Sequence, residues 1–510
     1  MSARGVILAV DQGTGSTKGI ALDTSGALQA RTEKPVALTN PEPGWVEQDP
    51  LEILASVHEV IERISAEAGQ PVAAVGLSTQ RESALAWDTA TGAPLTPVLG
   101  WQDRRTAAAA ERFGAADAAE VRRISGLPLD PMFSALKFAW ILDRLDPDRS
   151  HARAGAITLG TVDAWLTARL AGTRRVERGN ASRTQLLDIT TGEWSAELLE
   201  RFNIPLAALP TVVPSDAPGA TAPAGGRNPA PVAAVLGDSH AALFGHGCRV
   251  PGLVKATYGT GTSVMGLSAR THKTGITDTI AWDIGGCISR AFEGNILATG
   301  GTLVWLAGLL EVETSELAAL AEHTPDGGLD IVPAFAGLGA PWWDTSAIGL
   351  VSGLTLGTTR GQLARGAMES IALQIDDVIR SAESADGVRI AEIHVDGGPA
   401  GNDWLMQLQA DISARTVIRP GNGNLSAFGA AWLAGAAAGV WDPRTAPWDD
   451  ERRPGGTSPR GITVFRPALG EPDRRARLRR WHDAVARSRL RTPPGAALPE
   501  SARPGSGNTT

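Results

Sequence analysis

Three glycine-rich turns follow apolar segments of the chain, and turns of this composition suit the binding of phosphate. They span residues 11–15, 259–262 and 396–401. Backbone N–H groups in such turns form concave nests that hold anionic oxygens. Most glycine turns only reverse the chain, so one alone carries little weight, but three favour a nucleotide-binding protein. Lys18 follows the first turn and could reach a terminal phosphate, although the spacing matches neither a Walker A motif nor a G-x-G-x-x-G fingerprint.

Two aspartates, Asp11 and Asp238, stand where apolar strands are expected to end. Ligands gather at the carboxyl ends of strands in α/β folds. A carboxylate at such a place can hold Mg²⁺, since this hard ion prefers oxygen ligands. A second carboxylate can accept the proton of a hydroxyl during phosphoryl transfer. The alternative for each aspartate is that it only caps a turn.

Polar and aromatic residues after the expected strand at 72–77 could bind a hydroxylated ligand. Arg81 and Glu82 together offer hydrogen-bond donors and acceptors that suit a polyol. The alternative for this pair is a surface ion pair, which contributes little. Trp101 could place its apolar ring against the C–H groups of a sugar or polyol, and its alternative is ordinary core packing.

The elements that must position these residues alternate between strands and helices, which indicates an α/β protein. Apolar runs separated by glycine turns predict a β-meander over residues 6–10, 18–23 and 27–36. Asp49 and Pro50 favour a helix start, and Gly69 favours its end. The apolar residues between them recur at helical spacing: Leu51, Leu54, Val57, Ile61 and Ile64.

A similar plan recurs in the second half, which predicts two domains whose phosphate-type turns face each other. Strands are expected at 232–236, 253–258, 263–267 and 392–395, and helices at 361–381 and 402–412. The segment 217–231 is rich in Pro, Gly and Ala and is expected to be a surface loop.

Composition narrows the class of protein. The 510 residues carry a net charge of −8, which argues against a general nucleic-acid binder. Only two cysteines are present, which excludes a disulfide framework and a thiolate zinc site. The uncharged stretch 425–441 is shorter than the ~20 residues of a membrane span and predicts a buried helix. No signal-peptide layout precedes residue 6, so we expect a cytoplasmic protein without membrane insertion.

Several short motifs, taken in order, are similar to those of the FGGY carbohydrate kinases, and within that family to the glycerol kinases. They run in order from residue 6 to about 490 and so cover nearly the whole chain. The motifs are Asp11-Gln12-Gly13-Thr14, Pro43-Gly44-Trp45-Val46-Glu47-Gln48-Asp49-Pro50, Gln80-Arg81-Glu82, Gly160-Thr161-Val162-Asp163, Asn180-Ala181-Ser182-Arg183-Thr184, Thr257-Tyr258-Gly259-Thr260-Gly261, Gly337-Leu338-Gly339-Ala340-Pro341 and Val395-Asp396-Gly397-Gly398 with Asn402.

The resemblance implies two actin-like (ribonuclease H-like) domains with ATP and substrate in the cleft between them. Residues 1–246 would form the N-terminal domain, which carries the polyol site, the first phosphate loop and the catalytic Asp. Residues 247–490 would form the ATP-binding C-terminal domain, and residues 491–510 a disordered tail. The hinge is expected near 245–252, and domain closure would keep water from the γ-phosphate.

The resemblance also implies roles for single residues. Asp238 would be the general base and, with Asp11, would associate with Mg²⁺. The remaining positions fall into two groups. The residues that would bind ATP are Gly13, Thr14, Gly15, Lys18, Thr260, Gly261, Gly301, Gly398 and Asn402. Those toward the polyol are Arg81, Glu82, Trp101, Met132, Asp238, Ser239 and Ser263.

The chain departs from the glycerol kinase pattern around the expected polyol pocket. Met132 stands where Tyr is usual, Ser239-His240 replaces a pair of Gln residues, and Ser263 replaces a common Phe. Lys18 stands where Arg is common. These changes predict a roomier pocket, in which His240 could donate to an additional hydroxyl.

The expected function is ATP-dependent phosphorylation of a terminal hydroxyl of glycerol or a similar small polyol. The alternative acceptor is a larger C4–C5 polyol or ketose, of the tetritol, pentitol, xylulose or ribulose type. A different class is a non-catalytic actin-like regulator that binds nucleotide. A homo-oligomer, either a dimer or a tetramer, is expected from the resemblance.

Overall fold

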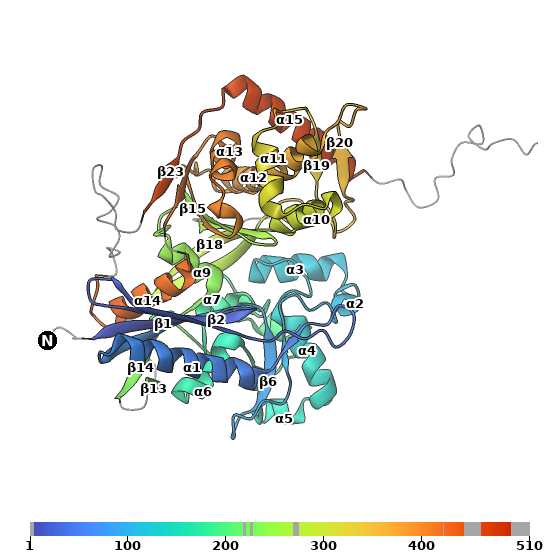
Figure 1. Cartoon of the computed structure of the whole chain (residues 1–510). Coiled ribbons are helices and arrows are strands. Elements are labelled where there is room, and N and C mark those ends of the chain that lie inside the picture. The colour runs from blue at the N-terminus through green and yellow to red at the C-terminus, as the bar shows by residue number, and fades with distance from the viewer. Residues whose placement is uncertain are drawn as a thin grey trace, which may run out of the picture.

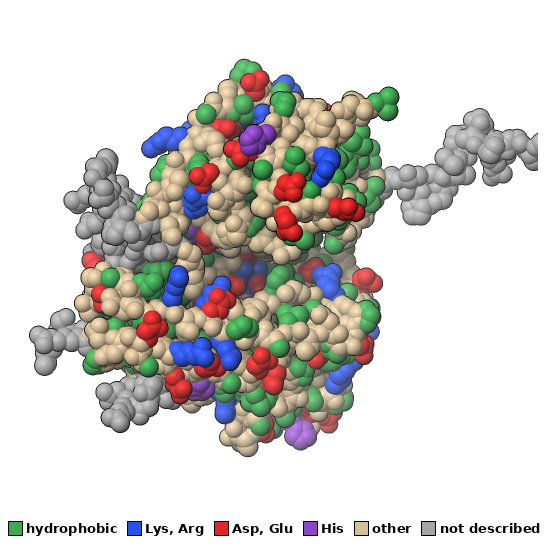
Figure 2. Space-filling model, viewed as in Figure 1, with side chains coloured by type: hydrophobic (Ala, Val, Ile, Leu, Met, Phe, Trp, Pro, Cys, Tyr) green, Lys and Arg blue, Asp and Glu red, His purple; other side chains and the backbone are tan. Residues whose placement is uncertain are grey.

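The structure is a computed structural model that describes residues 5–217, 221–224, 228–268, 275–421, 423–442 and 461–490. The chain forms two α/β halves, one above the other in Figure 1, each built around its own sheet. The space-filling view shows a hollow between the two halves, with charged side chains inside it (Figure 2). The expected tail, residues 491–510, lies outside the described residues.

The first half is built on a six-stranded sheet with the order β13-β14-β5-β1-β2-β3. Its strands are β1 (Val6–Gln12), β2 (Ser16–Leu22), β3 (Leu28–Pro35), β5 (Val72–Thr79), β13 (Thr221–Ala224) and β14 (Asn228–Gly237). Strands β1, β2 and β3 pair antiparallel in succession, as the meander predicted. Strands β1, β5 and β14 run parallel to one another, so their carboxyl ends meet at one edge of the sheet.

Helix α1 (Pro50–Ala68) packs on this sheet and follows the expected local signals. The Asp49 carboxylate accepts a hydrogen bond from the Leu51 N–H at 2.8 Å, which caps the first turn. Gly69 ends the helix in the left-handed region, with φ of 60°. The expected apolar face is wrong at Leu51, which is 52% exposed, because the buried stripe includes Ile53 and Val60 instead.

The second half repeats the plan around a seven-stranded sheet with the order β17-β18-β16-β15-β21-β22-β23. Its strands are β15 (Leu253–Tyr258), β16 (Thr262–Leu267), β17 (Thr277–Ile284), β18 (Cys287–Ile296), β21 (Glu392–Gly397), β22 (Thr416–Arg419) and β23 (Thr463–Phe465). Strands β15 and β16 form a hairpin, and β21 runs parallel to β15, just as β5 does to β1. The turns after β1, β15 and β21 are the three glycine turns that suit phosphate.

Helices surround both sheets. The longest, α12 (Arg360–Asp386), extends beyond the expected 361–381. The other principal helices are α3 (Ala115–Ser125), α4 (Ser134–Leu145), α6 (Val162–Ala171), α7 (Arg178–Ser182), α10 (Gly300–Leu310), α11 (Thr314–Glu322), α13 (Asp403–Ser413) and α15 (Glu471–Ser488). A smaller sheet in the first half pairs β4 (Glu47–Gln48), β7 (Val98–Leu99), β6 (Ala84–Asp88) and β8 (Ile157–Thr161).

Two helices cross at the junction of the halves, α9 (Asp238–Gly245) and α14 (Leu425–Ala437). Their backbones touch, because a Cβ on Gly429 would lie 1.9 Å from the Ala241 carbonyl oxygen. Helix α14 also packs on β5 and β1 of the first sheet, although it comes from far along the chain (Figure 1). It is buried, as expected for 425–441. Among the described residues, no helix is long and apolar enough to span a bilayer.

One expected loop is wrong. The segment 217–231 contains β13 and the first residues of β14, which pair antiparallel. Its Pro and Gly content pointed away from a strand, but β13 is the outermost strand of the sheet. Proline is tolerated at such an edge because one side of the strand needs no ladder hydrogen bonds.

Candidate functional site

The carboxyl ends of the parallel strands of the first sheet bring the expected catalytic residues together. Asp11 lies beside Ser78 in the β1–β5 pairing, and the Ser78 hydroxyl donates to its Oδ1 at 2.7 Å. Arg81 follows β5, Asp238 follows β14, and the Arg81 Nε donates to the Asp238 Oδ1 at 3.1 Å. The Asp238 side chain is 39% exposed, so it is accessible to a ligand.

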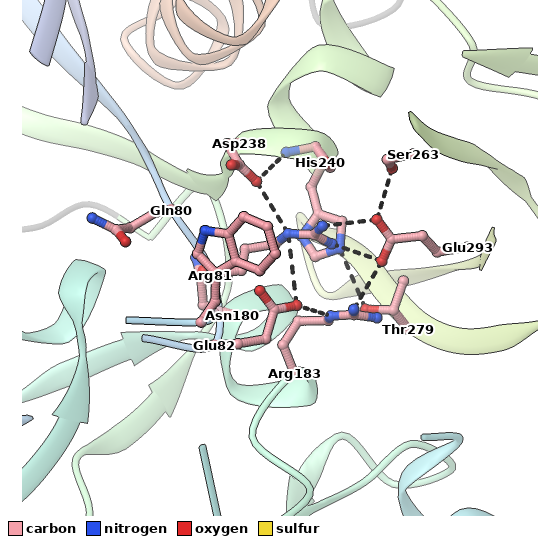
Figure 3. A network of polar contacts seen from close by, with 12 residues as sticks. Gln80, Arg81, Glu82, Asn180, Arg183, Asp238, His240, Ser263, Thr279 and Glu293 are labelled. Carbon is pink, nitrogen blue, oxygen red and sulfur yellow. Dashed lines mark hydrogen bonds and ion pairs between the residues drawn. The ribbon is translucent and has the colours of Figure 1, made fainter. Parts of the chain in front are cut away.

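A buried cluster of alternating charges holds Arg81 in place (Figure 3). Its Nη1 and Nη2 donate to the two oxygens of Glu293, at 3.1 and 2.7 Å. Arg183 forms an ion pair with Glu293 at 2.9 Å and donates from Nε to Glu82 at 2.6 Å. Burial would raise the pKa of Glu293, but the guanidinium groups of Arg183 and Arg81 hold it well below its usual value. The alternative of a surface ion pair at Arg81 and Glu82 is therefore wrong, because both residues are buried.

Sequence reasoning missed Glu293 and assigned no role to Arg183. Glu293 lies on β18, on the far side of the Arg81 guanidinium, and its side chain has no exposed surface. One signal was available, because Glu293 is the only charged residue between Arg290 and Glu311. A carboxylate in such a run must find a cation when it is buried.

Ser263 and His240 also contact this cluster. The Ser263 hydroxyl donates to Glu293 at 2.8 Å and accepts from the Lys255 ammonium at 3.1 Å. His240 is fully buried, and its Nε2 lies 3.3 Å from the Thr279 hydroxyl. Burial, with the nearby Arg81 charge, lowers the pKa of His240 well below its usual value. The expectation that His240 donates to a substrate hydroxyl is wrong, because the ring is closed off from solvent.

Trp101, the ring expected to cover the polyol, lies beside the first phosphate loop. Trp101 is 38% exposed, and its indole N–H donates to the Thr14 hydroxyl at 3.0 Å. Met132 is half-buried, and its carbonyl accepts a hydrogen bond from Lys137. The Glu82 carbonyl lies 3.4 Å from the same ammonium. Lys137 therefore ties together the backbones of two expected acceptor-binding residues.

Lys137 gives the stability of the protein a pH dependence. Burial lowers the pKa of Lys137 from 10.5 to about 7, against the opposing pull of Glu82 and Asp103. Between these two values the unfolded chain holds the proton and the folded chain does not, so stability increases as the pH rises. We expect the excess stability of the wild type over Lys137→Met to grow from pH 7 to pH 9, measured by urea unfolding.

The control for this prediction is Lys34→Met, which makes the same change at a lysine whose side chain is 43% exposed. Its difference from the wild type should stay constant over the same pH range. A constant difference for Lys137→Met as well would show that the buried ammonium does not titrate in this window.

The expected nucleotide residues of the second half line a cavity of about 610 Å³. Thr260, Gly301, Gly398 and Asn402 are among its lining residues, while Gly261 is not. A Cβ on Gly398 would meet no protein atom within 4 Å, and the same holds for Gly15 in the first loop. The protein itself therefore gives no packing reason for glycine at these places, which fits a ligand that approaches the backbone closely.

Carboxylates face one another where the Mg²⁺ is expected. Burial, together with the neighbouring charges of Asp238 and Asp396, raises the pKa of Asp11 to about 6. The Asp396 Oδ1 is buried without a hydrogen-bond partner, and its Oδ2 lies 3.1 Å from the His246 Nε2. A divalent cation would relieve this crowding of negative groups. Among the residues that the structure describes, no group of three or more His, Cys, Asp or Glu side chains is arranged to hold a metal ion.

Comparison with known proteins agrees with this arrangement. Residues 6–245 match the N-terminal domain of the FGGY family of carbohydrate kinases, and residues 254–438 match its C-terminal domain. The glycerol kinase of Aromatoleum aromaticum is 41% identical over 500 residues, which cover 95% of this chain and 98% of that protein. The apulose kinase of Pectobacterium atrosepticum is 40% identical over 504 residues, with coverage of 95% and 99%.

A solved structure is similar along nearly the whole chain. The crystal structure of Plasmodium falciparum glycerol kinase with ADP has a TM-score of 0.86 at 25% identity, and the match covers 96% of this chain and 99% of that one. The chain therefore belongs to the FGGY family of carbohydrate kinases, ATP-dependent enzymes with a two-domain actin-like (ribonuclease H-like) fold.

Proposed function

We propose that this protein transfers the γ-phosphoryl group of ATP to a terminal hydroxyl of glycerol or a similar small polyol. The observation that carries the proposal is the exposed Asp238 carboxylate, held by Arg81 at the edge of the sheet from which the first phosphate loop also rises. Further support is the identity of about 40% to proteins named glycerol kinase along nearly the whole chain.

Asp238 acts as the general base in the proposed reaction. Its carboxylate takes the proton of the acceptor hydroxyl while the oxygen forms a bond to the γ-phosphorus and ADP leaves. The Arg81 guanidinium is already bound to Glu293 and Asp238, so it holds the base in place and presents its remaining surface to the polyol. Trp101 covers the apolar side of the acceptor. Transfer of this kind relies on positioning and charge neutralisation.

In the proposed complex, Lys18 and backbone N–H groups of the turns after β1 and β15 hold the phosphates of ATP. Lys18 lies directly opposite Asp11 in the β1–β2 pairing, so a cation and a carboxylate share the entrance to the first loop. When bound, Mg²⁺ would neutralise charge on the transferred group, and Asp11 and Asp238 would hold it. The adenosine would occupy the 610 Å³ cavity of the second half, beside Gly398 and Asn402.

A larger acceptor is the second candidate. The identity of 40% to an apulose kinase favours it, because that similarity equals the similarity to several glycerol kinases. Ser239 and Ser263 are short side chains at positions where the resemblance implies contact with the acceptor, and the Ser263 hydroxyl is already engaged with Glu293 and Lys255. Neither serine projects an apolar wall that would exclude a C4–C5 chain.

A screen for acceptor-dependent ADP release distinguishes these candidates. Glycerol, the tetritols, the pentitols, xylulose, ribulose and apulose should be compared by kcat/KM at fixed ATP and Mg²⁺. We expect one acceptor to stimulate ADP release well above the acceptor-free rate. Folded protein that binds ATP but responds to none of them would contradict the proposal and would favour a non-catalytic regulator. The domain boundary near 246, a cytoplasmic location and a homo-oligomeric state stay predictions.

A further inference from the structure

A buried network of three glutamine side chains lies beneath the first phosphate loop. Gln80 is 1% exposed, and its Nε2 donates to the Oε1 of Gln12 at 3.1 Å and to the Oε1 of Gln48 at 2.9 Å. The Nε2 of Gln12 donates to the Gly13 carbonyl at 2.7 Å, and the Nε2 of Gln48 donates to the Thr14 carbonyl at 2.8 Å. Two carbonyls of the phosphate loop are therefore held by amides that Gln80 holds in turn.

The donor side of Gln80 decides the orientation of the other two amides. A primary amide has two N–H hydrogens on one end and an oxygen on the other. Gln80 donates both of its N–H hydrogens, one to Gln12 and one to Gln48. These two residues must therefore present their oxygens to Gln80 and their own N–H groups to the loop. One side chain thus sets the direction of every hydrogen bond between the network and the loop.

The consequence for the loop follows from peptide geometry. In a trans peptide the C=O and the N–H of the next residue point in opposite directions. With the carbonyls of Gly13 and Thr14 turned down to the network, the N–H groups of Thr14 and Gly15 point the other way. Within the described part of the chain neither N–H has a hydrogen-bond partner, and Gly15 is exposed. These two donors are available to phosphate oxygens.

The side-chain oxygen of Gln80 is linked to Trp101 through Ser83. Its Oε1 accepts from the Ser83 hydroxyl at 2.8 Å, and the same hydroxyl accepts from the Trp101 backbone N–H at 3.1 Å. In Figure 3 the Gln80 amide points away from the Arg81 side chain, so it belongs to this network and not to the charged cluster. We propose that Gln80 is a positioning residue that turns the N–H groups of Thr14 and Gly15 toward the phosphates of ATP. Through Ser83 it also fixes the position of Trp101 relative to these N–H groups.

This inference rests on the proposed function, and its test separates a phosphate effect from general damage. Adenosine, ADP and ATP are titrated by calorimetry into the wild type, Gln80→Met and Gln48→Met. Methionine keeps the length of the side chain but donates no hydrogen bond. Hydrogen bonds to charged groups are strong, so we expect Gln80→Met to lose about tenfold or more in the affinity ratio of ATP to adenosine. Gln48→Met frees only the Thr14 carbonyl and should lose less. Adenosine affinity should stay the same in both variants.

The control is Gln409→Met, which removes another fully buried amide whose partners are the Tyr258 hydroxyl and the Ala372 carbonyl. It should leave the affinity ratio at the wild-type value even if it lowers thermal stability. An unchanged ratio in both Gln80→Met and Gln48→Met would overturn the inference, and so would an equal loss for adenosine and ATP. A wild type that binds ATP tightly but phosphorylates no polyol would instead contradict the proposed function, while the ratio would still decide the role of Gln80.

Discussion

Asp238→Asn lowers the rate of phosphoryl transfer by at least about a hundredfold, the usual contribution of a general base, and leaves ATP affinity within about twofold of the wild type. Asparagine has nearly the same shape, and its Oδ1 can still accept the hydrogen bond from the Arg81 Nε. The variant therefore keeps the geometry of the site and an oxygen that can face Mg²⁺, but it loses the carboxylate charge that takes the proton. Transfer is measured as acceptor-dependent ADP release under saturating substrates, and ATP affinity by calorimetry.

Asp403→Asn is the matched control for this prediction. Asp403 also begins a helix, α13, and also pairs with an arginine, since its carboxylate lies 2.7 Å from the Arg419 Nη2. The same chemical change there should leave the rate unaltered. A full rate in Asp238→Asn would remove Asp238 as the base and would move that role to another carboxylate of the cleft.

Glu293→Gln lowers the free energy of unfolding by about 3–5 kcal/mol, the usual cost of breaking a buried ion pair by removing one partner. Glu293 is the shared partner of Arg81 and Arg183, and the side chains of all three are at most 8% exposed. With a neutral amide at this position the two guanidinium groups repel each other in a site that is almost closed to water. Urea unfolding at pH 7, followed by two independent probes, measures the loss.

The control is Glu59→Gln, at a carboxylate that pairs with Lys34 and Arg63 but is 32% exposed. Surface pairs contribute about 1 kcal/mol or less, so this variant should stay close to the wild type. Similar losses in both variants would contradict the view that burial makes the Glu293 cluster special. We also expect Glu293→Gln to weaken acceptor binding, because Arg81 loses the partner that orients it.

The predictions that held were those whose cause lies within a few residues of chain. The capped start of α1 at Asp49 and the hairpin of β1 and β2 each depend on local turn and capping chemistry. The carboxylates at the ends of β1 and β14 could be placed at one sheet edge because parallel strands end together. The family and its two-domain fold followed from the order of the motifs and were confirmed.

The contacts that local chemistry does not specify were missed. Arg81 and Glu293 are 212 positions apart in the chain, and no sequence signal near either residue indicates that the two would pair. His240 was expected in the pocket because it follows Asp238 closely, but the first turn of α9 carries its ring inward instead. The partner of a buried charge and the direction of a helical side chain depend on long-range packing, which only the folded structure shows.

The position of α14 also determines the order in which the chain can mature during synthesis. One face of the first sheet, with Ile7, Ala9 and Leu236, is covered by Phe428 and its neighbours on that helix. A nascent chain that has reached residue 246 holds every strand of this sheet but leaves that apolar face bare. The first half therefore cannot complete its core until nearly two hundred further residues have left the ribosome, and during that interval it exposes apolar surface of the kind that favours aggregation.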